Sequence, residues 1–293
     1  MAIKNSELIL NPDGSIYHLN LKPEHIADTI ITVGDQDRVA KVTSFFDEII
    51  FETQKREFKT QTGYYKGKKM TVISTGIGVD NIDIVMNELD ALVNIDLQTR
   101  KPKENLKSLK FVRIGTSGSV QKNIQVDQFV LSSAGIGFDG LIHFYKHNGV
   151  VDSEASQKLI EHLQLSATIG QPYFIQASQQ LLNHFLNADN KRVATGFTGT
   201  NIGFYGPQGR VLRIPLSHPN FIDDLAKFEY QGQQLTNLEM ETSAIYGLAK
   251  ILGHQALSIN AIIANRASGE FSSKPKETVM ELIEFSLDQL VTL

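Results

Sequence analysis

The stretch Leu109–Gly115, with the sequence LKFVRIG, is a near-continuous apolar run that ends in glycine and contains one arginine, Arg113. Strands buried on both faces of a sheet have this composition, because helices cover both sides of the sheet. We therefore predict a central strand here. Four other runs of the same character are also predicted as strands: Thr29–Gly34 (TIITVG), Met70–Gly76 (MTVISTG), Gln128–Ser132 (QFVLS) and Leu257–Ala264 (LSINAIIA).

The segments between these runs have helical periodicity. Within Ile82–Val93 and Val279–Leu290, apolar residues recur at the i, i+3, i+4, i+7 spacing, which gathers them on one helix face. Thr236–Gly253 is predicted as a further helix, with Gly253 at its C′ position. Strands that alternate with helices indicate an α/β fold. We expect one domain over residues 1–293, with a central mixed β-sheet flanked by helices.

Composition excludes several classes of protein. The 293 residues carry 28 Lys and Arg against 32 Asp and Glu, and this net charge of −4 argues against a nucleic-acid partner bound through a basic surface. With no cysteine, the chain has neither a thiolate zinc site nor a cysteine nucleophile. The histidines show no metal-ligand spacing, so no metal is predicted. We find no targeting signal and no membrane-spanning run, and we expect a cytoplasmic location.

Glycines follow or end three of the predicted strands, at Gly34, at Gly76 and Gly78, and at Gly115 and Gly118. In open α/β sheets, ligands bind at the carboxyl ends of the strands, where glycine lets backbone N–H groups approach an anion. These segments match neither the dinucleotide fingerprint nor the P-loop, and tight turns are the alternative interpretation.

Two arginines accompany these glycines. Arg38 follows Gly34 by four residues, and Arg113 lies two residues before Gly115. Guanidinium groups suit a phosphate dianion because they donate bidentate, charge-assisted hydrogen bonds. An arginine in an apolar strand needs a charged partner, so a buried ion pair with an acidic residue is the alternative for Arg113.

Seven motifs in this order resemble the nucleoside phosphorylases of the purine/uridine phosphorylase family, and most of all the uridine phosphorylases. The motifs are GDQDR (34–38), REF (56–58), STGIG (74–78), RIGTSG (113–118), FYGPQGR (204–210), EMETSA (239–244) and NR (265–266). The resemblance implies a pentosyl transfer in pyrimidine nucleoside salvage, the reversible phosphorolysis of uridine to uracil and α-D-ribose 1-phosphate. Two alternatives of the same fold stay open, a nucleosidase that uses water and a purine nucleoside phosphorylase, and a third is a silent nucleoside-binding protein.

The resemblance also implies roles for individual residues. Catalysis would rest on Arg113, Glu241, Gln208 and Arg210. Phosphate would be bound by Gly34, Arg38, Arg113 and Thr116, with Arg56 reaching into the neighbouring subunit's site, and His18 would touch the ribose 5′-hydroxyl across the dimer interface. The nucleoside would contact Ser117, Gly118, Phe204, Gln208, Arg210, Glu239, Met240, Glu241, Ile263 and Ala264, the two carboxylates lying at the ribose.

Some of these residues have plainer interpretations. Thr236-x-x-Glu239 fits a capping box, so Glu239 could serve only to cap a helix, and Glu241 could be a solvated acid in its first turn. His18 could be an ordinary surface residue, and Gln208 and Arg210 could lie in a solvated loop. Against this, preorganised donors such as an amide and a guanidinium suit the negative charge that develops on a departing uracil.

Substrate preference is predicted from two segments. Purine-specific relatives typically carry an aspartate near 263–266, whereas this chain reads Ala264-Asn265-Arg266, and they lack the Gln208-Gly209-Arg210 pair of donors. Uridine is also expected to be preferred over cytidine, whose amino group would face a donor. No organic cofactor or protein nucleophile is required, because phosphate is the co-substrate.

The shared site requires a homo-oligomer, at least a dimer, and the bacterial pattern of the family implies three dimers in a ring. Some bacterial relatives hold a monovalent cation between subunits through a Glu, a carbonyl and a Ser. The matching positions are Glu57, Ile77 and Asn81, and Asn81 in place of Ser argues against that ion.

Overall fold

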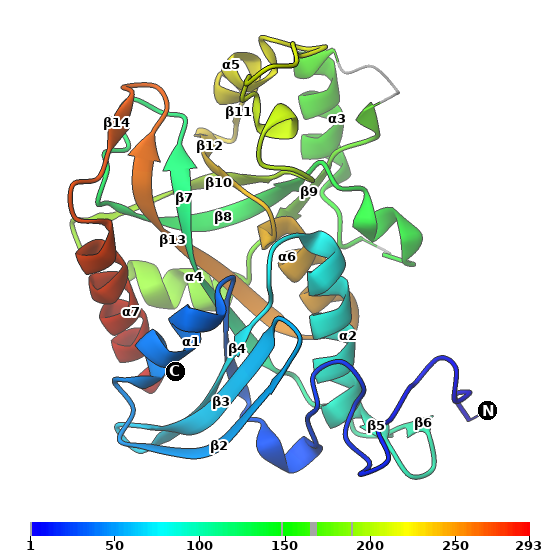
Figure 1. Cartoon of the computed structure of the whole chain (residues 1–293). Coiled ribbons are helices and arrows are strands. Elements are labelled where there is room, and N and C mark those ends of the chain that lie inside the picture. Colours follow the sequence, from blue (N-terminus) through cyan, green and yellow to red (C-terminus); the bar gives the residue numbers. More distant parts are fainter. Residues whose placement is uncertain (1, 148, 165–168, 189) are drawn as a thin grey trace.

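The computed structural model describes residues 2–147, 149–164, 169–188 and 190–293. Within them, twelve strands form one mixed sheet, in the order β11-β12-β10-β8-β13-β7-β1-β4-β3-β2, with β9 paired to β8 and β14 to β13 (Figure 1). The strands are β1 (Thr29–Val33), β2 (Glu48–Lys55), β3 (Phe58–Tyr65), β4 (Lys68–Ser74), β7 (Lys110–Ser119), β8 (Phe129–Gly137), β9 (Tyr173–Gln176), β10 (Val193–Thr200), β11 (Glu229–Tyr230), β12 (Gln233–Glu239), β13 (Gln255–Asn265) and β14 (Glu270–Phe271).

Helices cover both sides of this sheet, as Figure 1 shows, with α1 and α7 on one side and α2 and α6 on the other. The expected α/β fold with a central mixed sheet is confirmed. The helices are η1 (Pro23–His25), α1 (Gln36–Thr43), α2 (Val79–Asn94), η2 (Leu141–Phe144), α3 (Ser153–Leu163), α4 (Gln179–Leu186), η4 (Gly206–Gln208), α5 (Phe221–Ala226), α6 (Thr242–Leu252) and α7 (Pro275–Val291), and a small hairpin joins β5 (Ile95–Asp96) to β6 (Lys101–Pro102).

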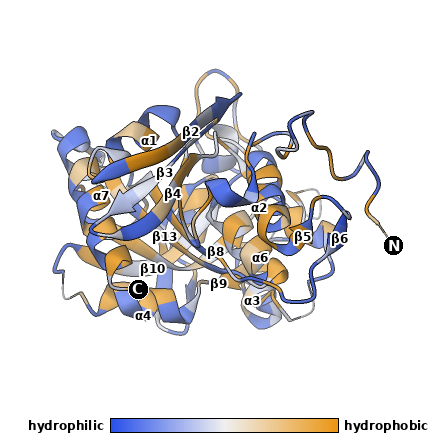
Figure 2. Ribbon diagram, turned by 90° about the horizontal axis from the view of Figure 1, so that it is seen from below, coloured by the Kyte–Doolittle hydropathy of each residue, from blue (hydrophilic) through white to orange (hydrophobic). Residues whose placement is uncertain are grey.

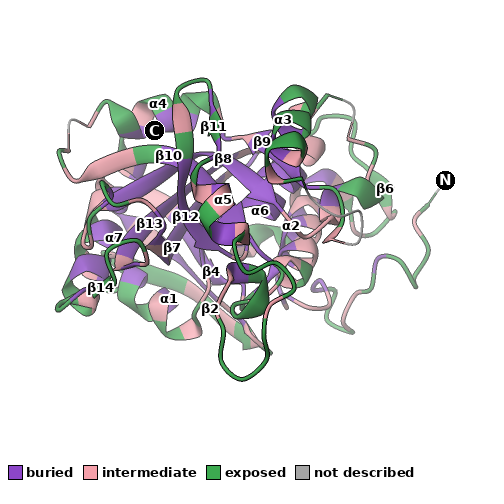
Figure 3. Cartoon of the chain, turned by 90° about the horizontal axis from the view of Figure 1, so that it is seen from above, coloured by how far each residue is buried: buried purple, intermediate pink, exposed green. Residues whose placement is uncertain are grey.

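Five of the strands close into a ring. β7 pairs in parallel with β13, β13 is antiparallel to β8, and β10 pairs in parallel with both β8 and β12. The antiparallel bridge between β12 and β7, at Asn237↔Ser119 and Leu238↔Gly118, completes the ring. Its strands are mostly buried and lie at the centre of the molecule in Figure 3. The ring therefore holds the ends of β7, β12 and β13 at fixed mutual positions.

The apolar patterns account for the main elements. The predicted faces of α2 and α7 are buried, including Ile82, Val85 and Met86 on α2 and Leu282 and Ile283 on α7. Each predicted apolar run contains or overlaps one strand of the sheet. Burying these faces removes about 25 cal/mol of unfavourable hydration per Å² of apolar surface, which is the main force that holds the layers together.

Two sequence-based boundaries are wrong. The helix predicted over Thr236–Gly253 begins only at Thr242, because Thr236–Glu239 belongs to β12 and pairs with β10. The Thr-x-x-Glu pattern is therefore no capping box, although Gly253 does end the helix in the left-handed conformation, with φ of 82°. Gly115 and Gly118 do not end a strand either, because β7 continues to Ser119.

The outer edge of the sheet is formed by β2. Two of its isoleucines, Ile49 and Ile50, are each 45% exposed, and Figure 2 shows an orange stretch on this strand. An exposed apolar edge strand is an unusual feature, because such edges attract further chains.

The described residues contain no helix that is long and apolar enough to span a membrane.

Candidate active site

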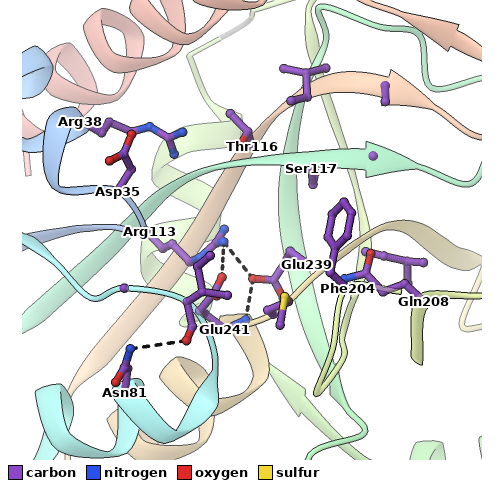
Figure 4. A pocket seen from close by; sticks show the side chains of 18 of the residues that line it. Asp35, Arg38, Asn81, Arg113, Thr116, Ser117, Phe204, Gln208, Glu239 and Glu241 are labelled. Carbon is purple, nitrogen blue, oxygen red and sulfur yellow. Dashed lines mark hydrogen bonds and ion pairs between the residues drawn. The ribbon is translucent and has the colours of Figure 1, made fainter. Parts of the chain in front are cut away.

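A cavity of about 950 Å³ opens where β1 and β4 end, between the carboxyl-terminal halves of β7, β12 and β13 and the loop that follows β10. All but two of the predicted site residues line it, and the exceptions are His18 and Arg56. Figure 4 shows Arg38 and Thr116 at one end, Arg113 with Glu239 and Glu241 in the middle, and Phe204 and Gln208 at the other end. The residues that line the cavity and were predicted are Gly34, Arg38, Arg113, Thr116, Ser117, Gly118, Phe204, Gln208, Arg210, Glu239, Met240, Glu241, Ile263 and Ala264.

A buried ion-pair cluster occupies the middle of the cavity. Arg113 Nη2 lies 2.6 Å from Glu241 Oε2 and 3.1 Å from Glu239 Oε2, while Nη1 donates to Asn260 Oδ1 at 2.7 Å. Burial opposes the charge on Arg113, but the two carboxylates outweigh it and raise the pKa of the guanidinium. The buried ion pair considered for Arg113 is thus present, and it lies inside the cavity.

Gly115 makes room for this arrangement. A Cβ atom at position 115 would stand 2.1 Å from Arg113 Nη1 and 2.4 Å from Asn260 Oδ1. Any larger residue would therefore displace the guanidinium from its partners. Gly115 is required for the close approach of the Arg113 side chain rather than for a turn.

The two carboxylates have different partners besides the arginine. Glu239 accepts hydrogen bonds from Thr200 Oγ1 at 2.7 Å and from the N–H groups of Glu241 and Thr242, at 2.9 and 3.0 Å. It therefore does cap α6, from the end of a strand. Glu241 accepts from the Gly78 N–H at 2.8 Å and is 5% exposed. The interpretation of Glu241 as a solvated acid is wrong.

A second guanidinium lies at one end of the cavity. Arg38, on α1, is half-buried, and its Nη1 lies 3.3 Å from the carbonyl oxygen of Ile114. Burial, and after it the positive charge of Arg113, lowers the pKa of Arg38. Gly34 and Thr116 line the same end. This end therefore offers positive charge, a hydroxyl and glycine backbone, which are the groups that bind anions.

The opposite end is formed by the loop around η4. Gln208 is buried, and its Oε1 accepts a hydrogen bond from Arg210 Nη1, which also donates to the Phe204 carbonyl at 2.7 Å. The guanidinium carbon of Arg210 lies 3.8 Å from the centre of the Phe204 ring. Arg266 donates to the carbonyl oxygens of Gln208 and Gly209. This loop is ordered by its own contacts, so it is not simply a solvated loop.

His18 and Arg56 lie outside the cavity of their own chain. Arg56 is exposed at the turn between β2 and β3, where its φ is +55°. His18 is bound to Glu88 on α2, with 2.6 Å between Nδ1 and Oε1. These are the two residues that the resemblance assigns to a neighbouring subunit's site.

Sequence reasoning missed two partners of the charged cluster, Ser258 and Asn260, which project toward Arg113. A signal was available for both, because they are polar residues two positions apart in an apolar strand and so share a face. Gly78, which the sequence singled out, donates its N–H to the carboxylate of Glu241. At the position considered for a cation, the Asn81 side-chain nitrogen lies 3.4 Å from the Ile77 carbonyl oxygen.

Residues 28–291 match the family model of the Phosphorylase superfamily. The chain belongs to the phosphorylase superfamily. Among its relatives in this superfamily, the uridine phosphorylase of Thermococcus kodakarensis is 30% identical over 265 residues, which is 88% of this chain and 80% of that protein. A purine nucleoside phosphorylase of the DeoD type from Bacillus cereus is 26% identical over 277 residues, 94% of this chain and 98% of that one.

Solved structures of this superfamily have the same fold. The Trypanosoma brucei nucleoside phosphorylase, which shows uridine phosphorylase activity, superposes with a TM-score of 0.88 at 30% identity, over 98% of this chain and 100% of that one. A uridine phosphorylase of Phytophthora capsici has the same fold, with a TM-score of 0.70 at 21% identity, over 100% and 99% of the two chains. Both uridine and purine enzymes occur among the relatives, so the substrate has to be argued from the cavity.

Proposed function

We propose that this protein is a uridine phosphorylase, which converts uridine and phosphate reversibly into uracil and α-D-ribose 1-phosphate in pyrimidine nucleoside salvage. The observation that carries the proposal is the order of groups along one cavity. Figure 4 shows the Arg38 guanidinium at one end, Arg113 with two carboxylates in the middle and the Gln208 amide at the other end. Arg210, which donates to Gln208, adds a third guanidinium there. This order matches phosphate, ribose and base in an extended ternary complex.

The anion-binding end suits the nucleophile. Arg38 and Arg113 repel each other, and a phosphate dianion bound by Arg38, Thr116 and the backbone at Gly34 would relieve this repulsion. In the reaction, a phosphate oxygen forms a bond to C1′ of the ribose while the bond from C1′ to N1 of uracil breaks, and the bonding pair leaves with the base. Phosphate supplies the nucleophile, so no protein side chain has to, and holding both reactants in line accounts for much of the rate.

The carboxylates suit the sugar. Glu241 lines the cavity next to Arg113, and carboxylate oxygens are acceptors for the two ribose hydroxyls. Arg113 neutralises part of their charge, and Glu239 is held by Thr200 and by the start of α6. We propose that this cluster orients the ribose and that its residual negative charge stabilises the positive charge that develops on the sugar.

The other end suits uracil. The Gln208 side chain can donate and accept along the amide edge of the base, and Arg210 can donate to a carbonyl oxygen that gains charge as the bond breaks. Purine-specific relatives typically carry an aspartate in the region 263–266, whereas the part of this region that lines the cavity is Ile263 and Ala264, so the region offers no acid to a purine nitrogen. These contacts favour uridine over purine nucleosides, and over cytidine as well.

We also propose that the enzyme is a homo-oligomer of at least a dimer, in which Arg56 and His18 complete the partner's site. Both residues lie outside their own cavity, and the nearby strand β2 exposes Ile49 and Ile50. The cytoplasmic location, the arrangement of three dimers in a ring and the absence of the interfacial cation stay predictions.

The first prediction concerns the co-substrate. Purified protein should release uracil from uridine only when phosphate is present, because phosphate is the nucleophile. Measuring uracil release by its absorbance, with and without phosphate, checks this. Adenosine and inosine should react far more slowly in the same assay. Equal rates of uracil release in phosphate-free buffer would identify a nucleosidase instead, and binding of uridine without turnover in either buffer would identify a silent binding protein.

The second prediction concerns base selection. Arg210→Ala should lower kcat/KM for uridine by about 10- to 100-fold, because a charge-assisted hydrogen bond to the base is worth about 1.5–3 kcal/mol. The KM for phosphate should change little. Arg213→Ala is the matched control, because Arg213 lies exposed in the same loop outside the cavity, and it should behave like the wild type. Loss of phosphate affinity alone in the Arg210 variant would contradict the assignment.

A further inference from the structure

The carboxylate of Glu88 accepts hydrogen bonds from one short segment near the N-terminus. Both of its oxygens lie 3.1 Å from the His18 backbone nitrogen, Oε2 accepts from the Leu19 N–H at 2.9 Å, and Oε1 lies 2.6 Å from His18 Nδ1. The Glu88 side chain is only 14% exposed. A shielded carboxylate with three donors from two consecutive residues fixes both the backbone and the ring at this point.

This contact decides which face the imidazole of His18 presents. A carboxylate is an acceptor, so Nδ1 carries the proton that is shared with Glu88. In the neutral ring, Nε2 is then the acceptor nitrogen, and it points away from Glu88 because the two nitrogens lie on different edges of the ring. An orienting carboxylate of this kind is the usual means of selecting one histidine tautomer.

A second contact ties this segment to the hairpin that carries Arg56. Lys55 donates to the Tyr17 carbonyl oxygen and to Asn11 Oδ1, and its ammonium lies 4.2 Å from the centre of the Tyr17 ring. Lys55 directly precedes Arg56 in the sequence, as Tyr17 precedes His18. The two residues proposed to enter the partner's site therefore belong to one connected structure, which Glu88 attaches to α2.

We propose that Glu88 is a positioning residue, which holds His18 in the Nδ1-protonated tautomer. His18 Nε2 then accepts a hydrogen bond from the 5′-hydroxyl of the nucleoside in the partner's site. This inference rests on the proposed function. Glu88 does not itself line the cavity, so it acts through His18 and through the backbone of the segment. A nucleoside without a 5′-hydroxyl gains nothing from this arrangement, and this makes the role separable from a general structural one.

The test compares uridine with 5′-deoxyuridine in five proteins: the wild type, Glu88→Ala, Glu88→Gln, His18→Ala and the double variant Glu88→Ala/His18→Ala. For Glu88→Ala, kcat/KM for uridine should fall about tenfold, mainly through KM, whereas the value for 5′-deoxyuridine should stay within about twofold. The kcat/KM of the double variant for uridine should be no lower than that of His18→Ala, because the two substitutions remove the same interaction. Glu88→Gln keeps an acceptor oxygen and should recover part of the loss.

Asp83→Asn is the matched control on the same helix, because Asp83 contacts Tyr145 and Asn87 and not the N-terminal segment. This variant should have the same kcat/KM as the wild type for both uridine and 5′-deoxyuridine. A readout independent of turnover is the ¹⁵N spectrum of the His18 ring, which should show the Nδ1-protonated tautomer in the wild type and a change in Glu88→Ala.

Two results would overturn the proposal: an equal loss on both nucleosides in Glu88→Ala, which would show a merely structural role, or no loss on uridine. If the wild type shows no phosphorolysis of uridine at all, the proposed function fails and this inference with it. The ¹⁵N spectrum of the His18 ring distinguishes failure of the proposed function from failure of the proposal for Glu88. In an inactive protein, a His18 ring that is hydrogen-bonded to Glu88 would show that the proposed function is wrong. A ring that is not bonded to Glu88 would show that the role given to Glu88 is wrong.

Discussion

Arg113→Ala will reduce kcat/KM for phosphorolysis by about 10²–10³-fold, the usual cost of removing one preorganised donor from a desolvated site. Arg113 is the only group within ion-pair distance of both Glu239 and Glu241 among the described residues. Its loss leaves Glu239 and Glu241, the proposed ribose carboxylates, without their counter-charge and removes one of the two guanidinium groups proposed to bind phosphate. Both effects raise the barrier, so the KM for phosphate should rise and kcat should fall. Steady-state kinetics with each substrate varied in turn measure this.

The same substitution will weaken the fold, which has to be separated from the kinetic effect. Removing one partner of a buried ion pair costs about 3–5 kcal/mol, because the remaining charge is left without compensation. Thermal unfolding followed by circular dichroism should show this loss, and the kinetics should be measured well below the lowered midpoint. Arg192→Ala is the matched control, since Arg192 pairs with Glu281 at the surface and away from the cavity. Kinetics unchanged from the wild type in folded Arg113→Ala would remove Arg113 from the site.

Mixing two inactive variants will restore activity. Arg113→Ala destroys the site of its own chain, whereas Arg56→Ala should destroy the site of the partner, because Arg56 lies outside its own cavity. When both chains are co-expressed in equal amounts, half of the dimers are hybrids and each hybrid has one intact site. The mixture should therefore recover about a quarter of the wild-type activity, as a symmetric two-site dimer requires.

Two controls make the mixing experiment decisive. Each variant expressed alone should be nearly inactive, and a mixture of Arg113→Ala with Glu241→Gln should show no recovery, because both changes lie in the same chain's cavity. Recovery in that second mixture, or none in the first, would contradict the shared site. Hybrids isolated through two different affinity tags should show about half of the wild-type activity per dimer.

The sequence alone predicted five of the twelve described strands of the sheet, because apolar runs are local patterns, and most of the cavity residues followed from the resemblance of short motifs to a known family. Apolar runs between helical periods identify buried strands, and the motifs are short enough to keep their residues together at strand ends. The error at Thr236–Glu239 has a physical reason. Apolar and polar residues in this stretch fit a helix as well as a strand, and the choice was made by pairing with β10, which is distant in sequence.

Long-range geometry could not be predicted from the sequence. The sequence pattern places Gly115 at a strand end, either beside an anion or in a tight turn, whereas it clears space for a side chain two positions earlier in its own strand. The partnership of Arg113 with Asn260 depends on the register between β7 and β13, which no local pattern reveals. The pairing of His18 with Glu88 joins residues 70 positions apart, and no motif pointed to it.

The closed ring of strands divides the cavity into parts that can change independently. Arg113 and Thr116 on β7 and Glu239 on β12, at the proposed phosphate and ribose positions, stand on strands whose mutual spacing is fixed by the β12–β7 bridge. At the proposed base end, Ile263 and Ala264 lie on β13 of the ring, whereas Phe204, Gln208 and Arg210 lie in the loop between β10 and α5, which belongs to no strand of the ring. Chimaeras that carry this loop from a relative with another base preference should therefore keep the same chemistry at the sugar. Changes confined to this loop would let one fold acquire different substrates in evolution.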